Sequence, residues 1–188
     1  MNSFFSQREL SGLAFKSVGN NVLISRYAHF YDTENISIGD NVRIDDFCIL
    51  SGHIEIGKYI HIAAFSSLYA GIEPIIIMDY SNISSHVSMY AKTDDYSGEF
   101  MTNPMVPQEF TNVIEKSVII NKHVIIGTNS AILPGAYLEE GVAIGSCSLV
   151  LKNCEAWGIY AGVPVRRIKE RKKNIKKLEN KFLDSQNL

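Results

Sequence analysis

Large aliphatic residues recur every six positions along most of the chain. A helix would give a period near 3.6 and a half-exposed strand a period of two, so neither explains this spacing. A period of six fits a short strand followed by a tight turn, with three such units closing one triangular coil and each aliphatic side chain pointing inward. The uninterrupted series are Ile38, Ile44, Leu50, Ile56, Ile62 and Leu68; Ile77, Ile83 and Met89; and Ile120, Ile126, Ile132, Leu138, Ile144 and Val150.

Glycine follows several of these aliphatic residues, as in "IGDNV", "IGKYI", "IGTNS" and "IGSCS". Gly and Asn adopt positive φ at little cost, so these segments are expected to turn the corners. Stacked coils would pair as parallel strands and bury columns of Ile and Leu side chains, each contributing about 1.5–3 kcal/mol. The pattern predicts five clear coils. A weaker series suggests a sixth coil near the start of the chain: Val18, Ile24 and Phe30.

The repeat stops between Met89 and Ile120. Pro104 and Pro107 argue against a regular strand or helix in this interval. A long loop inside a compact domain is uncommon unless it has a function, so we expect an inserted arm over residues 91–117 that reaches a neighbouring subunit and covers a binding cleft. The alternative is an insertion without function. Four large apolar residues would supply the contacts of the arm: Phe100, Met101, Met105 and Phe110.

The tail "RRIKERKKNIKKLENKF" holds nine of the eighteen Lys and Arg residues. Its apolar residues recur at roughly helical spacing, which predicts an amphipathic basic helix over residues 165–188. We therefore divide the chain into an N-terminal cap (1–17), a repeat domain with its insertion (18–164) and this helix. The apolar residues of the tail are Ile168, Ile175, Leu178 and Phe182.

Composition narrows the class of protein. Apolar residues make up 46% and charged residues 20% of the 188, too apolar for disorder, and the net charge of −2 does not indicate a nucleic-acid binder. No apolar run approaches the roughly 18 residues of a membrane span, and the N-terminus has no signal-peptide pattern. Cys48, Cys147 and Cys154 are too scattered for a disulfide framework or a zinc site. We expect a cytoplasmic protein with reduced thiols.

The "[LIV]-G-x4" hexads and the closing "YAGVPVRRIKER" resemble the hexapeptide-repeat acyltransferases over nearly the whole chain. The resemblance implies an all-β left-handed parallel β-helix, with the long loop insertion and the C-terminal α-helix added. It also implies acetyl-CoA as the acetyl donor and a homotrimer with active sites between subunits. Within the family, the chain is similar to galactoside- and maltose-type sugar O-acetyltransferases, and more so to enzymes that N-acetylate 4-amino-4,6-dideoxyglucose on a dTDP carrier.

Acetyl transfer needs a base for the proton of the acceptor and a hydrogen-bond donor for the oxyanion. Where the galactoside-type pattern has its catalytic histidine, this chain has Asp94, followed by Asp95. Three hypotheses remain open. Asp94 or Asp95 is the base; His86 is the base, oriented by a carboxylate; or the aspartates hold an acceptor ammonium group and no strong base is needed. We favour His86 with Asp94, although His86 also fits an ordinary surface corner.

The acceptor is expected to lie against the acidic segment "TDDYSGE", which includes Tyr96. His61 lies one coil earlier, where it would face the same cleft or be a plain surface residue. Carboxylates attract an ammonium group, so a sugar amine is favoured over a sugar hydroxyl. A nucleotide-sugar acceptor would place the protein in cytoplasmic assembly of a surface polysaccharide such as O-antigen. Three other histidines are interpreted as solvent-facing corner residues: His29, His53 and His123.

The resemblance also implies where CoA binds. Thr128 and Ser146 occupy small-residue positions beside the pantetheine arm, and Leu151-Lys152 follows where the family commonly has Thr-Lys. Arg166 and Lys169 follow "AGVP", where the family places basic side chains against the CoA phosphates, and a guanidinium suits phosphate. Each of these residues also fits a plain turn or surface.

Two other functions were weighed against acetyl transfer. A hydratase of the γ-class carbonic anhydrase type would need three converging histidines, and His61, His86 and His123 lack the close pair expected of such a site. A non-catalytic β-helix scaffold would need neither the long insertion nor the "AGVPVRR" ending. We therefore expect an acetyltransferase that uses no metal, and neither nucleic acid nor a membrane is expected as a partner.

Overall fold

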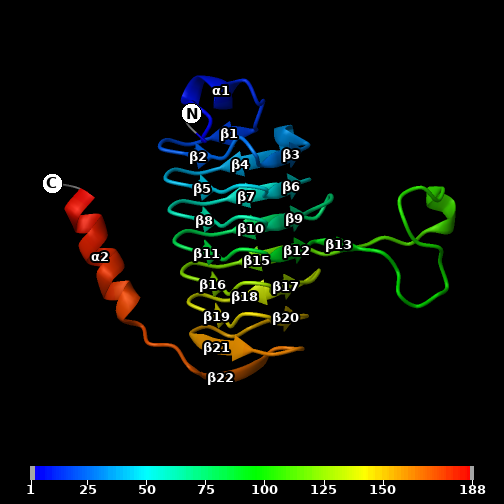
Figure 1. Ribbon diagram of the computed structural model, residues 1–188. Helices are drawn as coiled ribbons and strands as arrows, with labels where there is room; N and C mark the ends of the chain where they lie inside the picture. The colour runs from blue at the N-terminus through cyan, green and yellow to red at the C-terminus, as the bar shows by residue number, and fades with distance from the viewer. Residues whose placement is uncertain (1–2, 187–188) are drawn as a thin grey trace.

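The computed structural model describes residues 3–186, and the chain winds into a triangular parallel β-helix (Figure 1). Short strands from successive coils pair in register to form three parallel sheets, which are the three sides of the prism. The first sheet contains, in order, β1 (Ser17–Val18), β4 (Ile36–Ile38), β7 (Ile54–Ile56), β10 (Ile75–Ile77), β15 (Val118–Ile120) and β18 (Tyr137–Leu138).

The second and third sheets repeat this order one side further along each coil. The second contains β2 (Leu23–Ile24), β5 (Arg43–Ile44), β8 (His61–Ile62), β11 (Asn82–Ile83), β16 (Ile125–Ile126), β19 (Ala143–Ile144), β21 (Gly158–Ala161) and β22 (Arg166–Glu170). The third contains β3 (His29–Tyr31), β6 (Ile49–Ser51), β9 (Ser67–Tyr69), β12 (Ser88–Tyr90), β17 (Ala131–Ile132) and β20 (Leu149–Val150). Six complete coils result, so the weak first series is confirmed as a coil.

The predicted columns of aliphatic side chains form the core. Every residue of the three uninterrupted series is buried, with an exposed fraction of 4% or less. Val18 and Phe30 of the weaker series pack against this core from positions that are partly exposed. Because each coil stacks on the next, the core is continuous along the prism, and each coil depends on its neighbours.

The corners differ from the prediction in one respect. The glycines after the aliphatic residues do not supply the positive φ angles, which fall two residues later, as at Asn41 (φ 57°) and Asn129 (φ 57°). Gly39 and Gly127 are required for another reason, because a Cβ atom there would lie only 2.5 Å from the carbonyl oxygen of Gly57 and 2.6 Å from the backbone nitrogen of Ser146. Close stacking of adjacent coils, rather than turn conformation, therefore selects glycine.

Corner A, where the first sheet passes to the second, carries a ladder of rings. Tyr59 stacks on Tyr80 with ring centroids 5.2 Å apart, and Tyr80 stacks on His123 at 5.3 Å. Phe182 of helix α2 (Asn174–Gln186) meets the Tyr59 ring edge-on at 5.1 Å. His123 is thus buried, with 7% exposed, rather than solvent-facing as predicted, and its Nε2 lies 2.7 Å from Glu179 Oε2 of the same helix.

The end of the chain also departs from the prediction. Residues 166–170 form strand β22, antiparallel to β21, and α2 begins only at Asn174. Ile168 therefore lies in a strand and not on the apolar face of the helix. The reason is that β21 ends the stack of parallel strands and would leave a free edge, which β22 covers. Arg171, after β22, donates hydrogen bonds to the carbonyls of His123 and Gly141 (2.6 and 3.0 Å).

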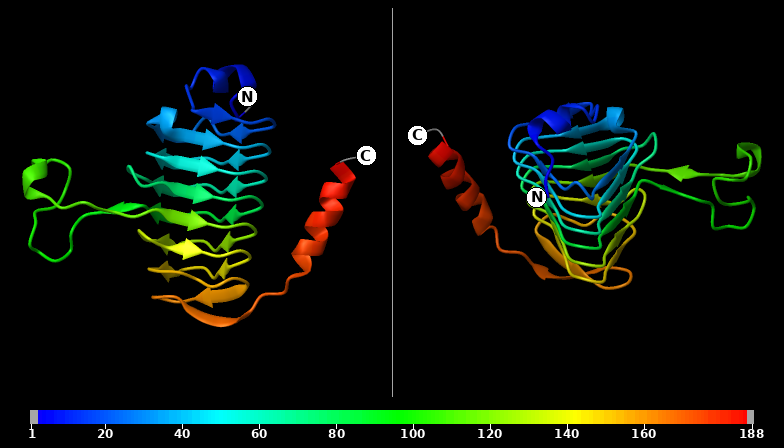
Figure 2. Two further views of the ribbon diagram at one scale, coloured as in Figure 1. Left: turned by 180° about the vertical axis from the view of Figure 1, so that it is seen from behind. Right: turned by 45° about the horizontal axis from the view of Figure 1, so that its top comes forward.

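The segment 91–117, which we call the arm, leaves the prism after β12 and returns at β15. Its base is a two-residue antiparallel pair, β13 (Lys92–Thr93) and β14 (Ile114–Glu115), and its tip contains the short 3-10 helix η2 (Gln108–Phe110). The arm and α2 project from different sides of the solenoid (Figure 2). At the N-terminus, α1 (Gln7–Ser11) closes the first coil, and η1 (Thr33–Asn35) lies between β3 and β4. No helix in residues 3–186 has the length and apolar character to cross a membrane.

Candidate active site

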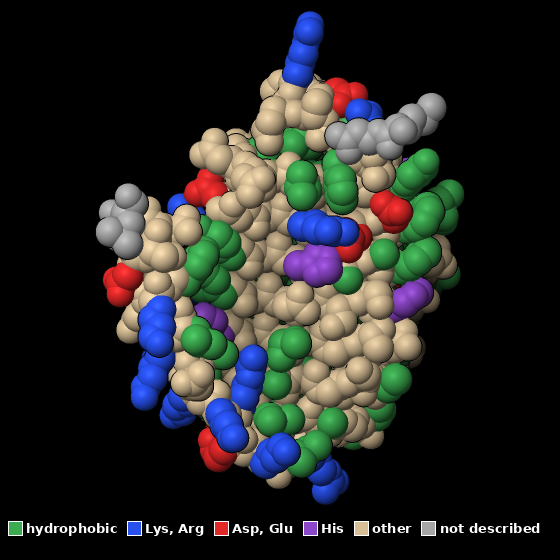
Figure 3. All heavy atoms as spheres, turned by 60° about the vertical axis from the view of Figure 1, so that its left-hand side comes forward, with side chains coloured by type: hydrophobic (Ala, Val, Ile, Leu, Met, Phe, Trp, Pro, Cys, Tyr) green, Lys and Arg blue, Asp and Glu red, His purple; other side chains and the backbone are tan. Residues whose placement is uncertain are grey.

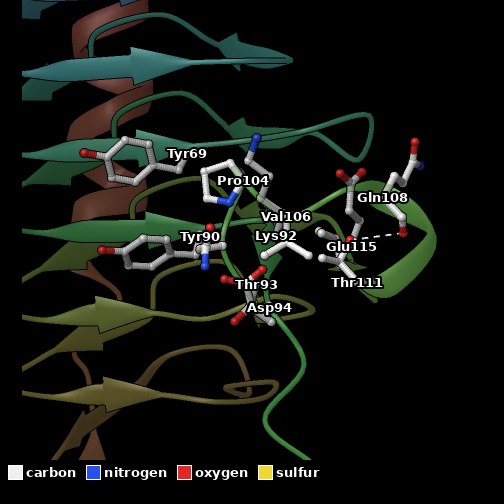
Figure 4. Close-up of a pocket in the computed structure, with 12 residues that line it drawn as sticks. Tyr69, Tyr90, Lys92, Thr93, Asp94, Pro104, Val106, Gln108, Thr111 and Glu115 are labelled. Atoms are coloured by element: carbon white, nitrogen blue, oxygen red, sulfur yellow. Dashed lines mark hydrogen bonds between the residues drawn. The ribbon is translucent and has the colours of Figure 1, made fainter. Parts of the chain in front are cut away.

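A cavity of about 690 Å³ lies where the arm leaves the third sheet (Figure 4). Tyr69 and Tyr90, one coil apart, stack with centroids 5.4 Å apart on the side of the solenoid, and the arm supplies the opposite wall. The volume is in the range of small-molecule sites. The cavity is lined by Tyr69, Tyr90, Lys92, Thr93, Asp94, Asn103, Pro104, Val106, Gln108, Thr111, Val113 and Glu115.

Asp94 follows β13 directly and lines this cavity beside Thr93 (Figure 4). It is half-buried, and within residues 3–186 its carboxylate has no hydrogen-bond or ion-pair partner. A carboxylate that is partly withdrawn from water and still has free oxygens is available to a ligand. Asp94 can therefore accept hydrogen bonds from an ammonium group or take up a proton.

Asp95, by contrast, is engaged within the arm. Its Oδ1 accepts hydrogen bonds from the backbone and the hydroxyl of Ser97, and its Oδ2 accepts one from Asn112 Nδ2 at 3.1 Å. The Ser97 hydrogen bonds hold the pKa of this carboxyl below its ordinary value. The next residue, Tyr96, is 92% exposed near the tip of the arm and does not line the cavity.

His86 lies at the other end of β12 from Asp94, so the favoured pair does not meet within one chain. Its exposed ring sits at corner B, where the second sheet passes to the third, and stacks on Phe65 with centroids 4.9 Å apart. No carboxylate within residues 3–186 forms an ion pair or hydrogen bond with this imidazole. The ring continues a ladder of exposed aromatic side chains along this edge (Figure 3), which contains Tyr27, Phe47 and Phe65.

His61, unlike His86, has a carboxylate partner. Its Nε2 lies 2.7 Å from Asp45 Oδ2, and Arg43 Nε donates to Asp45 Oδ1 at 2.7 Å. Burial works in the opposite direction, but the hydrogen bonds from His61 and Arg43 hold the pKa of Asp45 below its ordinary value. His61 lies on the outer face of the second sheet, opposite Asn82 in the pairing of β8 with β11, and outside the cavity at the base of the arm.

The residues expected near CoA fall into two places. Thr128 and Ser146 lie in adjacent coils at corner B, where the backbone N–H of Cys147 donates to the carbonyl of Thr128 at 2.8 Å. The Thr128 hydroxyl donates to the carbonyl of Ser85 at 2.6 Å, in the coil before. Lys152 is exposed beyond β20, and Arg166 and Lys169 are exposed on β22, the last strand of the solenoid. The structure thus brings the two hydroxyl residues together at corner B and the basic residues to the end of the prism.

Covalent catalysis would require a reactive cysteine, and metal catalysis would require a group of metal ligands. Burial raises the pKa of the Cys48 and Cys154 thiols to about 11, which leaves little nucleophilic thiolate at neutral pH. Cys147 is exposed at corner B, away from the arm. No group of three His, Cys, Asp or Glu side chains in residues 3–186 could hold a metal ion.

Sequence reasoning missed Tyr69, Tyr90, Lys92 and Glu115, which line the cavity with Asp94. The two tyrosines follow Leu68 and Met89, which are equivalent repeat positions in the paired strands β9 and β12, so the register of the repeat could have identified them. Glu115 carries no such signal, because its role depends on how the arm returns to the solenoid.

Comparison with known proteins indicates the class of reaction to which this site belongs. The chain is 49% identical over 186 residues to dTDP-4-amino-4,6-dideoxy-D-glucose acyltransferase of Escherichia coli, covering 97% of this chain and 96% of the relative. It matches no protein-family profile. AntD, an N-acyltransferase from Bacillus cereus solved in complex with dTDP and 3-hydroxybutyryl-CoA, is 53% identical, with a TM-score of 0.98 and complete coverage of both chains.

AntD has also been solved as D94A and D94N variants with dTDP and coenzyme A. Its S84A and S84C variants have been solved with dTDP-4-amino-4,6-dideoxyglucose and coenzyme A. The structural match confirms the predicted left-handed β-helix. On these grounds the chain belongs to the hexapeptide-repeat acyltransferases, close to dTDP-4-amino-4,6-dideoxyglucose acyltransferase.

Proposed function

We propose that this protein transfers an acyl group from a CoA thioester to the amino group of dTDP-4-amino-4,6-dideoxyglucose. The observation that carries the proposal is the half-buried carboxylate of Asp94 in the cavity at the base of the arm, which has no hydrogen-bond or ion-pair partner in the described part of the chain. AntD has been studied through substitutions at its residues 94 and 84, and this chain has aspartate and serine at those numbers. AntD carrying D94N still binds dTDP and coenzyme A, so such an aspartate is not needed to hold the nucleotide or the cofactor.

The reaction is a direct transfer. The amine of the acceptor arrives largely as an ammonium group, which the Asp94 carboxylate attracts and orients. Asp94 takes one proton, directly or through water, and the nitrogen lone pair attacks the thioester carbonyl. The C–N bond forms first and gives a tetrahedral oxyanion, whose collapse breaks the C–S bond. The second amine proton passes to the sulfur, and CoA leaves as the thiol. A backbone N–H receives the oxyanion. Asp95 keeps a structural role, since its oxygens are occupied by Ser97 and Asn112.

For the donor, we propose that the pantetheine arm lies along corner B beside Thr128 and Ser146, with the CoA phosphates near Lys152, Arg166 and Lys169. The stacked hydroxyl residues leave a path of small side chains there, and cations suit phosphate at the end of the prism. Acetyl-CoA is the donor we expect. Because AntD binds 3-hydroxybutyryl-CoA, the length of the acyl chain is part of the test.

We further propose a homotrimer with the active sites between subunits. Corner B exposes a ladder of stacked rings in which Tyr27, Phe47 and Phe65 are 56%, 48% and 51% exposed, a continuous apolar edge that a second copy would cover. Asp94 and His86 lie at opposite ends of β12, so a neighbouring subunit could supply the histidine that one chain does not bring to Asp94. Light scattering should give three times the monomer mass, and Phe65→Ser should reduce that mass.

The His61–Asp45 pair keeps sugar O-acetylation as a second candidate. An imidazole held by a carboxylate at 2.7 Å suits deprotonation of a hydroxyl group, which is a far weaker acid than an ammonium. We also propose that the product, when it is a nucleotide sugar, enters the cytoplasmic assembly of a surface polysaccharide such as O-antigen.

The test is release of CoA thiol, measured with Ellman's reagent, across a panel of acceptors. The panel contains dTDP-4-amino-4,6-dideoxyglucose, other amino-sugar nucleotides, and simple galactosides and glucosides. Turnover confined to amino-sugar nucleotides supports the proposal. Turnover on plain glycosides alone would replace it with O-acetylation and direct attention to His61. Absence of coenzyme A binding would favour the non-catalytic scaffold, whereas coenzyme A binding without turnover across the panel would mean that the acceptor is a different molecule.

A further inference from the structure

The base of the arm is weakly held by its own strand pair. Only two residue pairs join β13 to β14, Lys92 with Glu115 and Thr93 with Ile114, and one more hydrogen bond follows from the backbone N–H of Lys116 to the carbonyl of Ala91 (2.9 Å). An isolated two-stranded ribbon is marginally stable in water. Something else must fix the direction in which this ribbon leaves the solenoid.

Glu115 makes that connection. Its Oε2 accepts hydrogen bonds from the backbone N–H groups of Ile72 and Glu73 at 3.0 and 3.3 Å, in the turn between β9 and β10 of the coil above. Figure 4 shows the Glu115 side chain turned away from Asp94 and upward. Hydrogen bonds to an ionised acceptor are about twice as strong as neutral ones. The second strand of the arm is therefore fastened to the solenoid 43 positions away in sequence.

Gly71 leaves room for this contact. A Cβ atom on Gly71 would overlap the Oε1 atom of Glu115, so any larger residue there would displace the carboxylate. The absence of a side chain at this position and the hydrogen bonds to Ile72 and Glu73 are two independent features of the turn that fit the same carboxylate.

The contact of Glu115 with the 71–73 turn, which we call the clamp, lies beside the residue proposed to act on the acceptor. Glu115 lines the same cavity as Asp94, and its strand neighbour Ile114 pairs with Thr93, the residue before Asp94. A change in the direction of β14 would move β13 with it, and Asp94 would shift relative to Tyr90 on the wall of the solenoid. Misplacement by about 1 Å can cost a hundredfold in rate.

We propose that Glu115 is a positioning residue for the acceptor: its carboxylate clamps the arm to the 71–73 turn and so holds Asp94 in the cavity. This inference rests on the proposed function, since it assumes that the acceptor binds beside Asp94. We expect no contact between Glu115 and the acetyl-CoA donor.

The test compares Glu115→Ala, which removes the carboxylate, with Gly71→Ala, which keeps it but displaces it. Both variants should raise the KM for dTDP-4-amino-4,6-dideoxyglucose, and its Kd by calorimetry, about tenfold or more, while the KM for acetyl-CoA stays within about twofold. Glu115→Gln should recover part of the loss, because its amide oxygen still accepts a hydrogen bond. Glu109→Ala is the matched control, an exposed carboxylate of η2 outside the cavity, and should leave both constants unchanged.

A second measurement separates the clamp from the chemistry. Chymotrypsin should cut the arm, at residues such as Phe100 and Phe110, several times faster in Glu115→Ala and Gly71→Ala than in the wild type or Glu109→Ala. Unchanged cleavage, or acceptor and donor constants that rise together, would overturn the proposal. A wild type that turns over no amino-sugar nucleotide but binds it would refute the proposed function alone, and the acceptor Kd and the cleavage rates would still decide the clamp.

Discussion

The coils and the arm of this protein are held together in different ways. In the coils, every aliphatic residue of the uninterrupted repeats is buried, and each strand of the inner coils pairs with those above and below it. The arm instead exposes large apolar side chains such as Tyr96 (92%) and Met105 (90%) and is fastened by the two residue pairs of one strand pair and a few polar contacts. The regular part supplies stability, and the irregular part carries the free carboxylate, as loops on rigid scaffolds commonly do.

Removing the tip of the arm is the strongest test of this division of roles, in which the coils supply stability and the arm supplies the carboxylate for the reaction. Replacing residues 96–112 with a short glycine linker keeps Asp94 and the β13–β14 ribbon but deletes the cavity wall contributed by Pro104, Val106 and Gln108. We expect transfer to the amino-sugar nucleotide to fall about 100-fold or more, because the acceptor is no longer enclosed and oriented. The melting temperature should change by only a few degrees. Full activity in the shortened protein would mean that the arm is an insertion without function.

A substitution in the coils should have the opposite effect, lowering stability while activity is retained. Ile83→Ala opens a cavity at a fully buried position in β11, and we expect it to lower the free energy of unfolding by about 2–5 kcal/mol. Turnover per folded molecule at low temperature should stay close to that of the wild type. Denaturant unfolding and initial rates measured on the same sample test both parts, and a large loss of kcat without loss of stability would contradict the division.

A smaller effect is expected where α2 closes corner A. Burial would raise the pKa of Glu179, but hydrogen bonds from Lys122 and His123 hold it below its ordinary value of about 4.5. A carboxyl whose pKa is depressed by folding stabilises the protein fully above that ordinary value, and the contribution is lost as the pH falls through the lowered one. Glu179→Gln should therefore be less stable than the wild type at pH 7, and the difference should shrink below pH 4.5.

Thermal unfolding across a pH series measures this difference. Asp184→Asn is the matched control, because Asp184 is an exposed carboxylate on the same helix with no partner within residues 3–186. A difference between Glu179→Gln and the wild type that does not depend on pH would contradict the ion pair as its cause.

The sequence predicts the coils more completely than it predicts the arm. The six-residue period predicted the coils, because each coil repeats one local rule and its neighbours obey the same rule. The interruption of that period predicted the position of the arm, and the resemblance to galactoside-type enzymes pointed to Asp94 within it. The direction of the arm could not be predicted, since it depends on Glu115 meeting a turn 43 positions earlier.

Two predictions depend on neighbours in three dimensions that local spacing does not reveal. Within one chain, β12 separates His86 from Asp94 along one side of the prism, so their pairing stays a prediction that involves a neighbouring subunit. The helix predicted from residue 165 ignored the free edge of β21, which β22 covers before α2 can begin. The same holds for His123, which looks like a corner residue in the sequence and is buried because α2 returns over it.

The most direct test of the account is the rate of CoA thiol release from acetyl-CoA with dTDP-4-amino-4,6-dideoxyglucose, for the wild type and Asp94→Asn. Acetyl-CoA binding is measured on both by calorimetry. If Asp94 orients the ammonium group and takes its proton, the substitution should lower turnover about 100-fold or more and leave the Kd for acetyl-CoA within about twofold. Wild-type turnover in Asp94→Asn would contradict the account and remove this carboxylate from the mechanism.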